Sequence, residues 1–573
     1  MRGAVCAACG ALLATLATAG TVPQLEIHGA PEALAANLRA HLALDTLPCA
    51  LDDETLAARL ARRLDRIAAA ARALGYYALR YRHRLRREAD CWTLELDVEP
   101  GPRLTIGEVS IVFQGDAARD PAFAELRATS APRVGEPLDH GRYEAFKDAV
   151  ETLALERGYF DGRWLEHRLE VDPPAGRARI RLVFDGGRRH RFGALHIEPG
   201  PLSESLLARY APWRPNDFYR HDRLLAYQQA LLDADYFAEV ELRPRPEDRR
   251  DGAVPIELRT TPLPRHVWSL GVGAATDTGP RLSLEHLDRY RNPAGHRFGQ
   301  SLSLSPLRSE LRLDYRIPLA RPATEQLALQ SAYREESDQT VDARAMRLGA
   351  VYSRLLPRRW LQHWGLSLER ERYAVADTRR DSRLLLPSLG LSKTEADDPL
   401  YPRHGWRAAL ELRGSSTRLG SDIDFLQAVV RLKQVLGLGP GRLSWRLDLG
   451  RSRVDALDTL PASLRFFAGG DQSVRGYRYR TLGPVDERGE VTGGSHLAVA
   501  GLEYDWRFAG DWAAALFVDA GNAYSDAQPL DPKRGAGFGL RWITPVGPIR
   551  IDLAKALDDG GRWRLHLSMG PDL

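Results

Sequence analysis

The sequence predicts three small α+β repeats followed by a sixteen-stranded, all-β barrel that crosses a membrane. Two observations support this fold class. A pattern that joins an aromatic pair to two strands occurs three times before residue 263, and from residue 266 the chain changes to long runs of alternating polar and apolar residues. The length of 573 residues is sufficient for several such domains.

The first residues have the pattern of an export signal. Arg2 provides a positive charge, residues 4–17 form a small apolar run, and the ATA at 17–19 fits an A-x-A cleavage site. An ordinary N-terminal helix is the alternative, but the TVPQLEIHG that follows restarts as a strand. We therefore predict a signal peptide over residues 1–19 and export of the chain.

Two cysteines, Cys49 and Cys91, lie beyond the predicted signal peptide. In an exported protein they could form one disulfide, and two buried free thiols are an equally good interpretation. The spacing of the two residues does not decide between these alternatives.

The charge pattern does not predict a nucleic-acid partner. The chain has 80 lysines and arginines against 76 acidic residues, which gives a net charge of +4. The basic residues are spread from end to end, whereas a nucleic-acid surface gathers them on one element.

The front half contains the repeated pattern. Its aromatic pair and first strand recur at residues 73–85, 156–169 and 233–246. Each copy follows a helical pattern and precedes a second strand, so that one unit is a strand, two helices and two strands. The three units are predicted over 23–101, 102–187 and 188–263.

These units allow two interpretations. They could form a rigid spacer, or the open edges of their three-stranded sheets could capture an extended chain by strand addition. Strand addition recognises the backbone more than the side chains, and therefore suits many clients. We favour this second interpretation.

The back half, residues 266–573, consists of alternating strands. In RLSWRLDLG (442–450) and RWRLHLSMG (562–570) every second residue is large and apolar. Sixteen such runs can be counted, and an even number is what a single-chain outer-membrane barrel has. No window approaches 18 uninterrupted apolar residues, so no transmembrane helix is predicted.

A soluble β-sandwich would also alternate, and two features favour the barrel. The polar faces carry many arginines, acids and serines, as a water-filled lumen requires. The connections differ in length, since 290–295 is short and 452–494 is long. We therefore expect short turns at one rim, long loops at the other, and a sixth far-side loop over about 452–494.

The sequence contains no pattern typical of an enzyme. It has no H-E-x-x-H, no phosphate-binding glycine loop and no G-x-S-x-G, and its histidines lack the spacing of metal ligands. We expect no catalytic residues, no metal and no cofactor.

Three stretches carry a resemblance to a known family. GGDQSVRGYRY (469–479), FVDAGNAY (517–524) and GAGFGLRWITPVGPIRIDLA (535–554) resemble motifs of the BamA-like superfamily of outer-membrane assembly proteins, whose POTRA repeats precede a barrel. RFFAGGDQSVRGYRY and the closing GPDL (570–573) are most similar to the TamA group within it. The resemblance covers essentially the whole mature chain.

The resemblance implies that the sixth loop folds back into the barrel lumen. Its motif comprises Gly469, Gly470, Val474, Arg475, Gly476 and Tyr477, and the strand motif that it meets comprises Phe517, Asp519 and Gly521. Arg475 is then expected to pair with Asp519 as a strut that holds the shape of the barrel. The alternative is that both are ordinary solvated lumen residues, and the surrounding glycines and Tyr477 argue against it.

The resemblance also implies a lateral gate between the first and last strands. The gate residues are expected to be Trp268, Leu270 and Val272 in the first strand and Trp563, Leu565 and Leu567 in the last. Gly560 and Gly561 begin the last strand, which should therefore pair poorly. Cysteines at positions 270 and 565 are therefore expected to cross-link the first strand to the last.

The function implied by the resemblance is assembly or translocation at the outer membrane of a Gram-negative cell, with the repeats in the periplasm. The implied partners are a TamB-like, inner-membrane-anchored periplasmic protein, unfolded β-rich clients such as autotransporters, and the lipid bilayer. A two-partner secretion pore, and a structural or porin-like barrel, are the alternatives. Three repeats and the lack of a spare N-terminal helix argue against the secretion pore.

Overall fold

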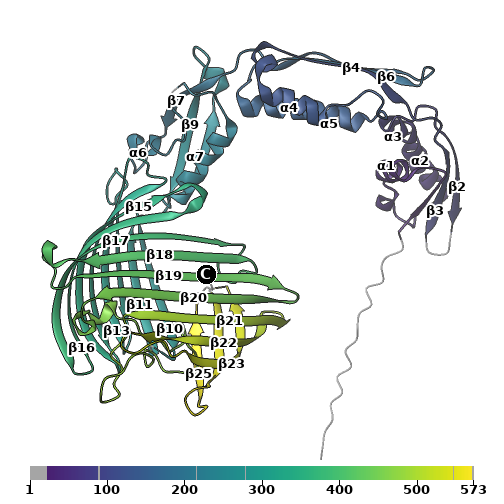
Figure 1. Cartoon of the computed structure of the whole chain (residues 1–573). Coiled ribbons are helices and arrows are strands. Elements are labelled where there is room, and N and C mark those ends of the chain that lie inside the picture. The colour runs from purple at the N-terminus through teal and green to yellow at the C-terminus, as the bar shows by residue number, and fades with distance from the viewer. Residues whose placement is uncertain (1–21, 88–90, 215, 278, 546, 571–573) are drawn as a thin grey trace, which may run out of the picture. The chain divides into compact units, whose positions relative to one another are not determined.

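In the computed structural model shown in Figure 1, residues 22–87, 91–214, 216–277, 279–545 and 547–570 are described. The predicted signal peptide lies outside the described residues. Among those residues, no helix is long and apolar enough to cross a membrane. The chain forms two compact units: one contains the first two repeats with part of the third, and the other contains the remainder of the third repeat with the barrel.

The three repeats are confirmed as small three-stranded sheets with helices. The first contains β1 (Gln24–His28), α1 (Glu32–Leu42), α2 (Asp53–Leu64), α3 (Ile67–Ala73), β2 (Arg80–Arg87) and β3 (Trp92–Glu99). The second contains β4 (Thr105–Gln114), α4 (Pro121–Ser130), α5 (His140–Arg157), β5 (Arg163–Asp172) and β6 (Arg177–Asp185). The third contains β7 (Arg191–Ile197), α6 (Glu204–Ala208), α7 (His221–Asp233), β8 (Phe237–Pro244) and β9 (Ala253–Pro262).

In each sheet the last strand in sequence lies in the middle, with the orders β1-β3-β2, β4-β6-β5 and β7-β9-β8. The first repeat departs from the predicted unit, because its helical segment is divided into three helices instead of two. Two strands of every sheet therefore have one neighbour only, among the described residues, and present an open edge.

Helix α5 illustrates how the sequence builds a repeat. Its buried residues Tyr143, Phe146, Val150 and Ala154 follow helical spacing and form one apolar face. The side chain of Asp139 caps the first turn by accepting hydrogen bonds from two backbone N–H groups. The apolar face packs in one core with alternate residues of β6, namely Ala178, Ile180, Leu182 and Phe184.

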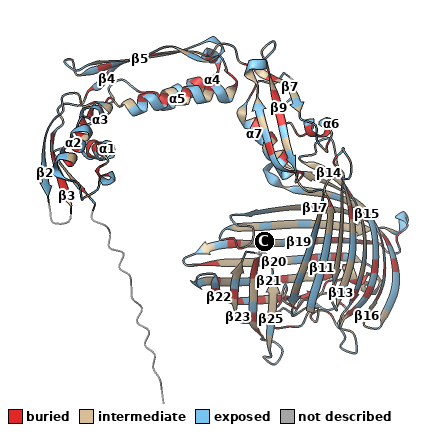
Figure 2. Ribbon diagram, turned by 180° about the vertical axis from the view of Figure 1, so that it is seen from behind, coloured by how far each residue is buried: buried red, intermediate tan, exposed pale blue. Residues whose placement is uncertain are grey.

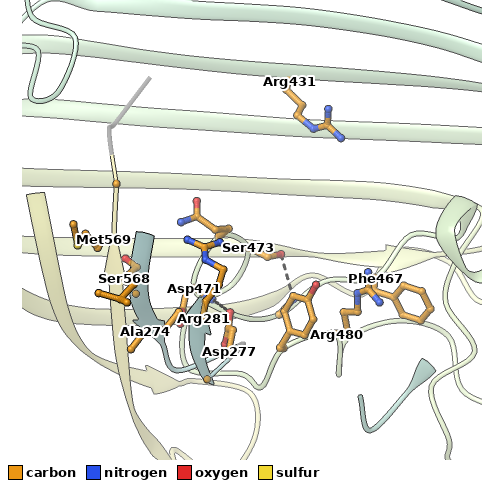
Figure 3. A pocket seen from close by; sticks show the side chains of 18 residues that line it. Ala274, Asp277, Arg281, Arg431, Phe467, Asp471, Ser473, Arg480, Ser568 and Met569 are labelled. Atoms are coloured by element: carbon orange, nitrogen blue, oxygen red, sulfur yellow. Dashed lines mark hydrogen bonds between the residues drawn. The ribbon is translucent and has the colours of Figure 1, made fainter. Parts of the chain in front are cut away.

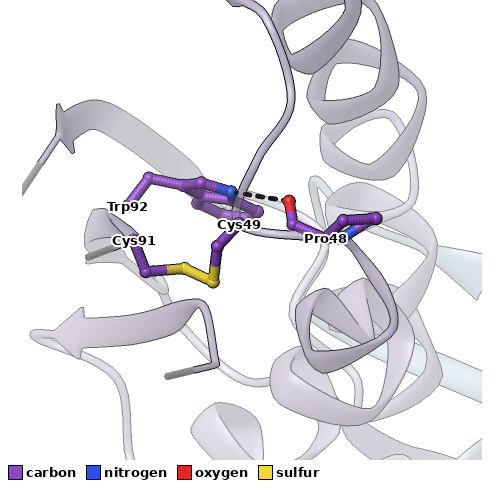
Figure 4. The surroundings of a disulfide bond; sticks show 4 residues. All are labelled: Pro48, Cys49, Cys91 and Trp92. Carbon is purple, nitrogen blue, oxygen red and sulfur yellow. Dashed lines mark hydrogen bonds between the residues drawn. A yellow bond between two sulfur atoms is a disulfide. The ribbon is translucent and has the colours of Figure 1, made fainter. Parts of the chain in front are cut away.

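Cys49 and Cys91 form a disulfide in the first repeat, which decides between the two interpretations that the sequence left open. Figure 4 shows Trp92 beside it, where the indole N–H donates to the carbonyl oxygen of Pro48 at 3.3 Å. The bond joins the segment before α2 to the start of the central strand β3, and therefore ties helices and sheet together.

The barrel has sixteen antiparallel strands, as predicted. They are β10 (His266–Ala275), β11 (Gly279–Asp288), β12 (Arg297–Leu304), β13 (Arg308–Pro318), β14 (Glu325–Ser337), β15 (Val341–Leu355), β16 (Leu361–Val375), β17 (Thr378–Ala396), β18 (Gly405–Ser415), β19 (Phe425–Leu438), β20 (Gly441–Val454), β21 (His496–Ala509), β22 (Trp512–Tyr524), β23 (Lys533–Thr544), β24 (Gly547–Ala556) and β25 (Trp563–Met569). Exposed and less exposed residues alternate along the wall strands (Figure 2), and many of the exposed ones are large and apolar, as expected for strands that face lipid.

The expected contrast in loop length between the two rims is wrong except at one loop. The far rim is the one at which β10 ends and β11 begins. Its first four connections, from β10–β11 to β16–β17, have two or three residues, and only the segment between β20 and β21, residues 455–495, is long. The reason lies in the strands: β15, β16 and β17 contain 15, 15 and 19 residues, so that paired wall continues where loops were expected. We call residues 455–495 loop 6.

The strands at the two ends of the barrel sheet are shorter than this high wall. β10 contains 10 residues and β25 contains 7. At a rise of about 3.3 Å per residue, β25 extends for about 23 Å, and a tilted strand of that length covers less than the full apolar band of about 25 Å.

The opposite rim, where β11 ends and β12 begins, contacts the last part of the third repeat. The Tyr236 hydroxyl, from the third aromatic pair, donates to the carbonyl oxygen of Gly295 at 2.5 Å, and the Arg297 guanidinium lies 4.1 Å above the Tyr236 ring. Arg289 pairs with Asp235 at 3.3 Å. The aromatic pair thus has a structural role here, because it anchors the repeat to the turn between β11 and β12.

Candidate functional site

Loop 6 packs against the barrel wall through its glycines. Gly469, Gly470 and Gly476 all have φ between 94° and 105°, a region that residues with a Cβ rarely adopt. At Gly476 a Cβ would also lie 2.8 Å from the backbone nitrogen of Ala556 in β24. The loop backbone therefore contacts the strand backbone directly, and the neighbouring Val474 is completely buried.

This close approach gives a testable prediction. We expect Gly476→Ala to detach the loop, because it adds about 1–3 kcal/mol of overlap to the about 1–2 kcal/mol of backbone strain. Gly489→Ala is a matched control in the same loop, since its φ is 81° but nothing lies within 4 Å of the added Cβ. The midpoint of thermal unfolding in detergent should fall clearly further for Gly476→Ala. Equal shifts would show that the strand contact is not important.

Arg475 is the most connected side chain of the loop. Its guanidinium donates to Asp519 at 2.7 Å, to Glu503 at 2.6 Å and to Asp552 at 3.0 Å. Its backbone N–H donates to Asp519 at 3.2 Å, and its guanidinium carbon lies 3.4 Å from the ring centroid of Phe517. Burial makes charge-assisted bonds of this kind strong, so that Arg475 holds the loop against four strand residues.

Further guanidinium groups complete this charge cluster. Arg541, which is fully buried, donates to Glu503 at 2.8 Å and also to Asp552. Arg446 donates to Asp519 at 3.2 Å and also to the backbone carbonyl oxygens of residues 472 and 473 in the loop. Each of the three carboxylates, Asp519, Glu503 and Asp552, therefore has two cationic contacts, and none is left uncompensated.

The structure brings together Arg475, Phe517 and Asp519, which the sequence had selected. Gly521 lies in β22 at a close approach to β21, where a Cβ would be 2.3 Å from the carbonyl oxygen of Ala498. Sequence reasoning missed Glu503, Asp552 and Arg541. Their only signal was a charged residue at a lumen-facing position of an alternating strand, and many lumen positions in this chain are charged.

The seam between β10 and β25 has little pairing. Among the described residues, one backbone hydrogen bond joins them, from the Thr276 N–H to the Leu567 carbonyl oxygen at 3.3 Å, and the Leu567 N–H donates to the Thr276 hydroxyl at 3.2 Å. Antiparallel continuation of this pair brings Ala274 opposite Met569. A cavity of about 700 Å³ lies beside this end of the seam (Figure 3), lined by residues 272–275, 568–570 and parts of loop 6.

The six predicted gate residues do not face one another. Trp268, Leu270 and Val272 have 64, 73 and 79 % of their surface exposed, and Trp563 and Leu565 are also exposed. Leu567 alone bonds across the seam. Thr276 pairs with Leu567. Leu270 lies six residues before Thr276, and in an antiparallel pair its partner would follow Leu567, but Leu565 precedes Leu567 by two residues. The pair at 270 and 565 is therefore out of register.

Comparisons with known proteins agree with this architecture. The Omp85 superfamily domain matches residues 284–572, and the TamA-type first POTRA domain matches residues 24–100. Two curated relatives are outer membrane protein assembly factors BamA. That of Nitratidesulfovibrio vulgaris is 33 % identical over 26 % of this chain, and that of Neorickettsia risticii is 20 % identical over 83 % of it. These matches span 20 % and 66 % of the relatives' own lengths.

A solved structure shares the fold. The crystal structure of BamA from Haemophilus ducreyi lacking POTRA domains 1–3 superposes with a TM-score of 0.69 at 16 % sequence identity. The match covers 82 % of this chain and 99 % of that one.

Proposed function

Because the chain belongs to the Omp85 superfamily, and its first repeat is of the TamA type, we propose that it inserts or secretes β-rich client proteins at the Gram-negative outer membrane through the seam between β10 and β25. The repeats would lie in the periplasm and capture the client. The observation that carries this proposal is the unpaired edge of β10.

The physical reason is the cost of an unpaired backbone in lipid. Each backbone N–H or C=O that faces hydrocarbon without a partner costs several kcal/mol. β10 contains ten residues, and among the described residues only Thr276, just beyond its end, bonds to β25. A client strand that adds to β10 satisfies its own backbone and that of β10 together. This gain, together with burial of the client's apolar face, can drive insertion without a nucleotide.

The open edges of the first two repeats support the capture step. β2 and β5 each have a single neighbour in their sheets and can accept an extended client by strand addition. By analogy with the TamA group, we propose that a TamB-like periplasmic protein docks at the first repeat or the barrel, and that autotransporters are among the clients.

A porin-like barrel is the structural alternative, and loop 6 argues against it. Arg475, Arg446 and their carboxylates hold loop 6 against β21 and β22 at 2.6–3.2 Å, on the face opposite the exposed Leu516 and Val518. A two-partner secretion pore would export one dedicated substrate through the lumen instead of releasing it through the seam.

Reconstitution tests the proposed function. We expect liposomes that contain the full chain to convert an urea-unfolded outer-membrane barrel into a protease-resistant, heat-modifiable form at least ten times faster than empty liposomes. A soluble protein of similar length serves as the control client and should gain no protection. A steady, large single-channel conductance without any effect on folding would contradict the proposal and favour the porin.

A further inference from the structure

One loop-6 carboxylate touches both sides of the seam. The Thr276 hydroxyl, just after β10, donates to the Asp471 carboxylate at 3.0 Å. On the other side, His566 of β25 bonds the same carboxylate through Nδ1. The backbone N–H of Asp471 also donates to Asp277 at 2.5 Å, and Figure 3 shows these two aspartates side by side at the cavity.

The histidine contact has a defined polarity. The backbone N–H of Gly476, within the glycine-arginine motif of loop 6, donates to His566 Nε2 at 2.9 Å. Nε2 must therefore carry a lone pair, and in the neutral ring the hydrogen is on Nδ1, from which it is donated to Asp471. Since His566 is buried, this arrangement satisfies both ring nitrogens.

Asp471 makes more hydrogen bonds to the two sides of the seam than the two sides make directly with each other. Directly, the described residues share one backbone bond of 3.3 Å and one side-chain bond of 3.2 Å, both at Thr276. The Thr276 hydroxyl accepts from β25 and donates to Asp471, so that it too is part of the same network. Without Asp471, little remains to hold β10 to β25.

We infer that Asp471 is the latch of the seam, a positioning residue that closes the gate by bonding the first and last strands at once. The inference rests on the proposed function in one respect: the proposed function states that the seam opens to admit a client. The closed seam itself is a property of the chain without a client.

The latch is built to be released. Asp277 and Asp471 bring two carboxylates together in a partly buried place, and burial together with the charge of Asp471 raises the pKa of Asp277 to about 6. Holding two ionised carboxylates this close opposes the hydrogen bonds that close the seam. Because the repulsion between the carboxylates opposes the hydrogen bonds of Asp471, the closed seam is only moderately more stable than the open one, as a gate requires.

Three of these side chains also have the spacing of a metal site. One donor atom each of Asp277, Asp471 and His566 lie within 4.8 Å of one another. The hydrogen bond from Gly476 argues against this, because it occupies the lone pair of Nε2 and leaves the hydrogen on the nitrogen that faces the carboxylates. A hydrogen-bonded latch satisfies every group without an ion.

The test measures closure in the absence of a client. With Ala274→Cys and Met569→Cys in the full chain in liposomes, a short pulse of oxidant traps the closed seam as a disulfide. We expect Asp471→Ala to reduce the trapped fraction at least fivefold, and Gln472→Ala, the matched control at the next loop position, to leave it unchanged. Thr276→Val keeps the side-chain volume and the loop's own bonds, and should reduce trapping about twofold to threefold.

The outcomes are distinguishable. Trapping that is unchanged in both Asp471→Ala and Thr276→Val overturns the latch, even if the wild-type chain assembles clients. Reduced trapping in a chain that assembles no client supports the latch and contradicts the proposed function instead. If EDTA alone reduces trapping in the parent pair, and zinc restores it, the site is a metal site and the hydrogen-bonded latch is wrong.

Discussion

Oxidation of a cysteine pair at positions 274 and 569 is expected to reduce client assembly at least fiftyfold. The register that starts from the Thr276–Leu567 hydrogen bond brings these two positions opposite one another, within reach of a disulfide. A covalent bond there keeps β10 and β25 together, so that no client strand can add to the β10 edge. The rate of folding of an urea-unfolded barrel in liposomes measures the effect, and a mild reductant should restore it.

The matched control joins two strands that are already paired. Leu270 of β10 lies opposite Leu284 of β11, and a disulfide between cysteines at these positions leaves the seam free. Assembly should then continue at the parent rate, as it should in each single-cysteine variant. Full activity of the oxidised 274/569 pair would mean that clients do not pass through the seam.

Replacement of Arg475 by Met is expected to have the second largest effect. It leaves the buried Asp519 and Asp552 and the half-buried Glu503 with one cation fewer, and removal of one member of a buried ion cluster costs about 3–5 kcal/mol. Loop 6 should detach from the wall, the midpoint of thermal unfolding should fall, and client assembly should slow at least tenfold.

Two comparisons isolate the cause. Arg478→Met removes an exposed arginine from the same loop, whose bond to Gln339 is 3.4 Å long, and should change neither quantity. The double variant Arg475→Met/Asp519→Asn also removes the negative charge of Asp519, which the single variant leaves without its Arg475 partner, and should recover part of the thermal stability. If Arg475→Met and Arg478→Met behave alike, the cluster does not anchor the loop.

The fold could be predicted because its elements are repetitive. The alternation of polar and apolar residues identifies each strand locally, and the recurring aromatic pair marks each repeat. The loop lengths could not be predicted from the same pattern. In β17, for example, the first residues, 378–381, read TRRD and do not alternate, but pairing with β16 makes them part of a strand of 19 residues.

Only part of the candidate site could be predicted. Arg475 and Asp519 belong to recognisable motifs. Asp552 meets loop 6, and Asp471 of loop 6 meets Thr276 and His566, only after the barrel closes. The seam was placed out of register because no tight turn connects β10 to β25, and a turn is what fixes the register of neighbouring strands. Contacts of this kind depend on the closure of the whole barrel.

Site-specific photo-cross-linking tests the central proposal most directly. A photoreactive residue at position 272, on the exposed edge strand β10, is compared with one at position 348, which is also an exposed apolar position but lies within the wall on β15. During assembly of a client in liposomes, we predict adducts with the client at 272 that appear and then decline as the client is released, and none at 348. Efficient assembly with no client adduct at 272, or with equal adducts at both positions, would contradict the proposal that clients enter the membrane along β10.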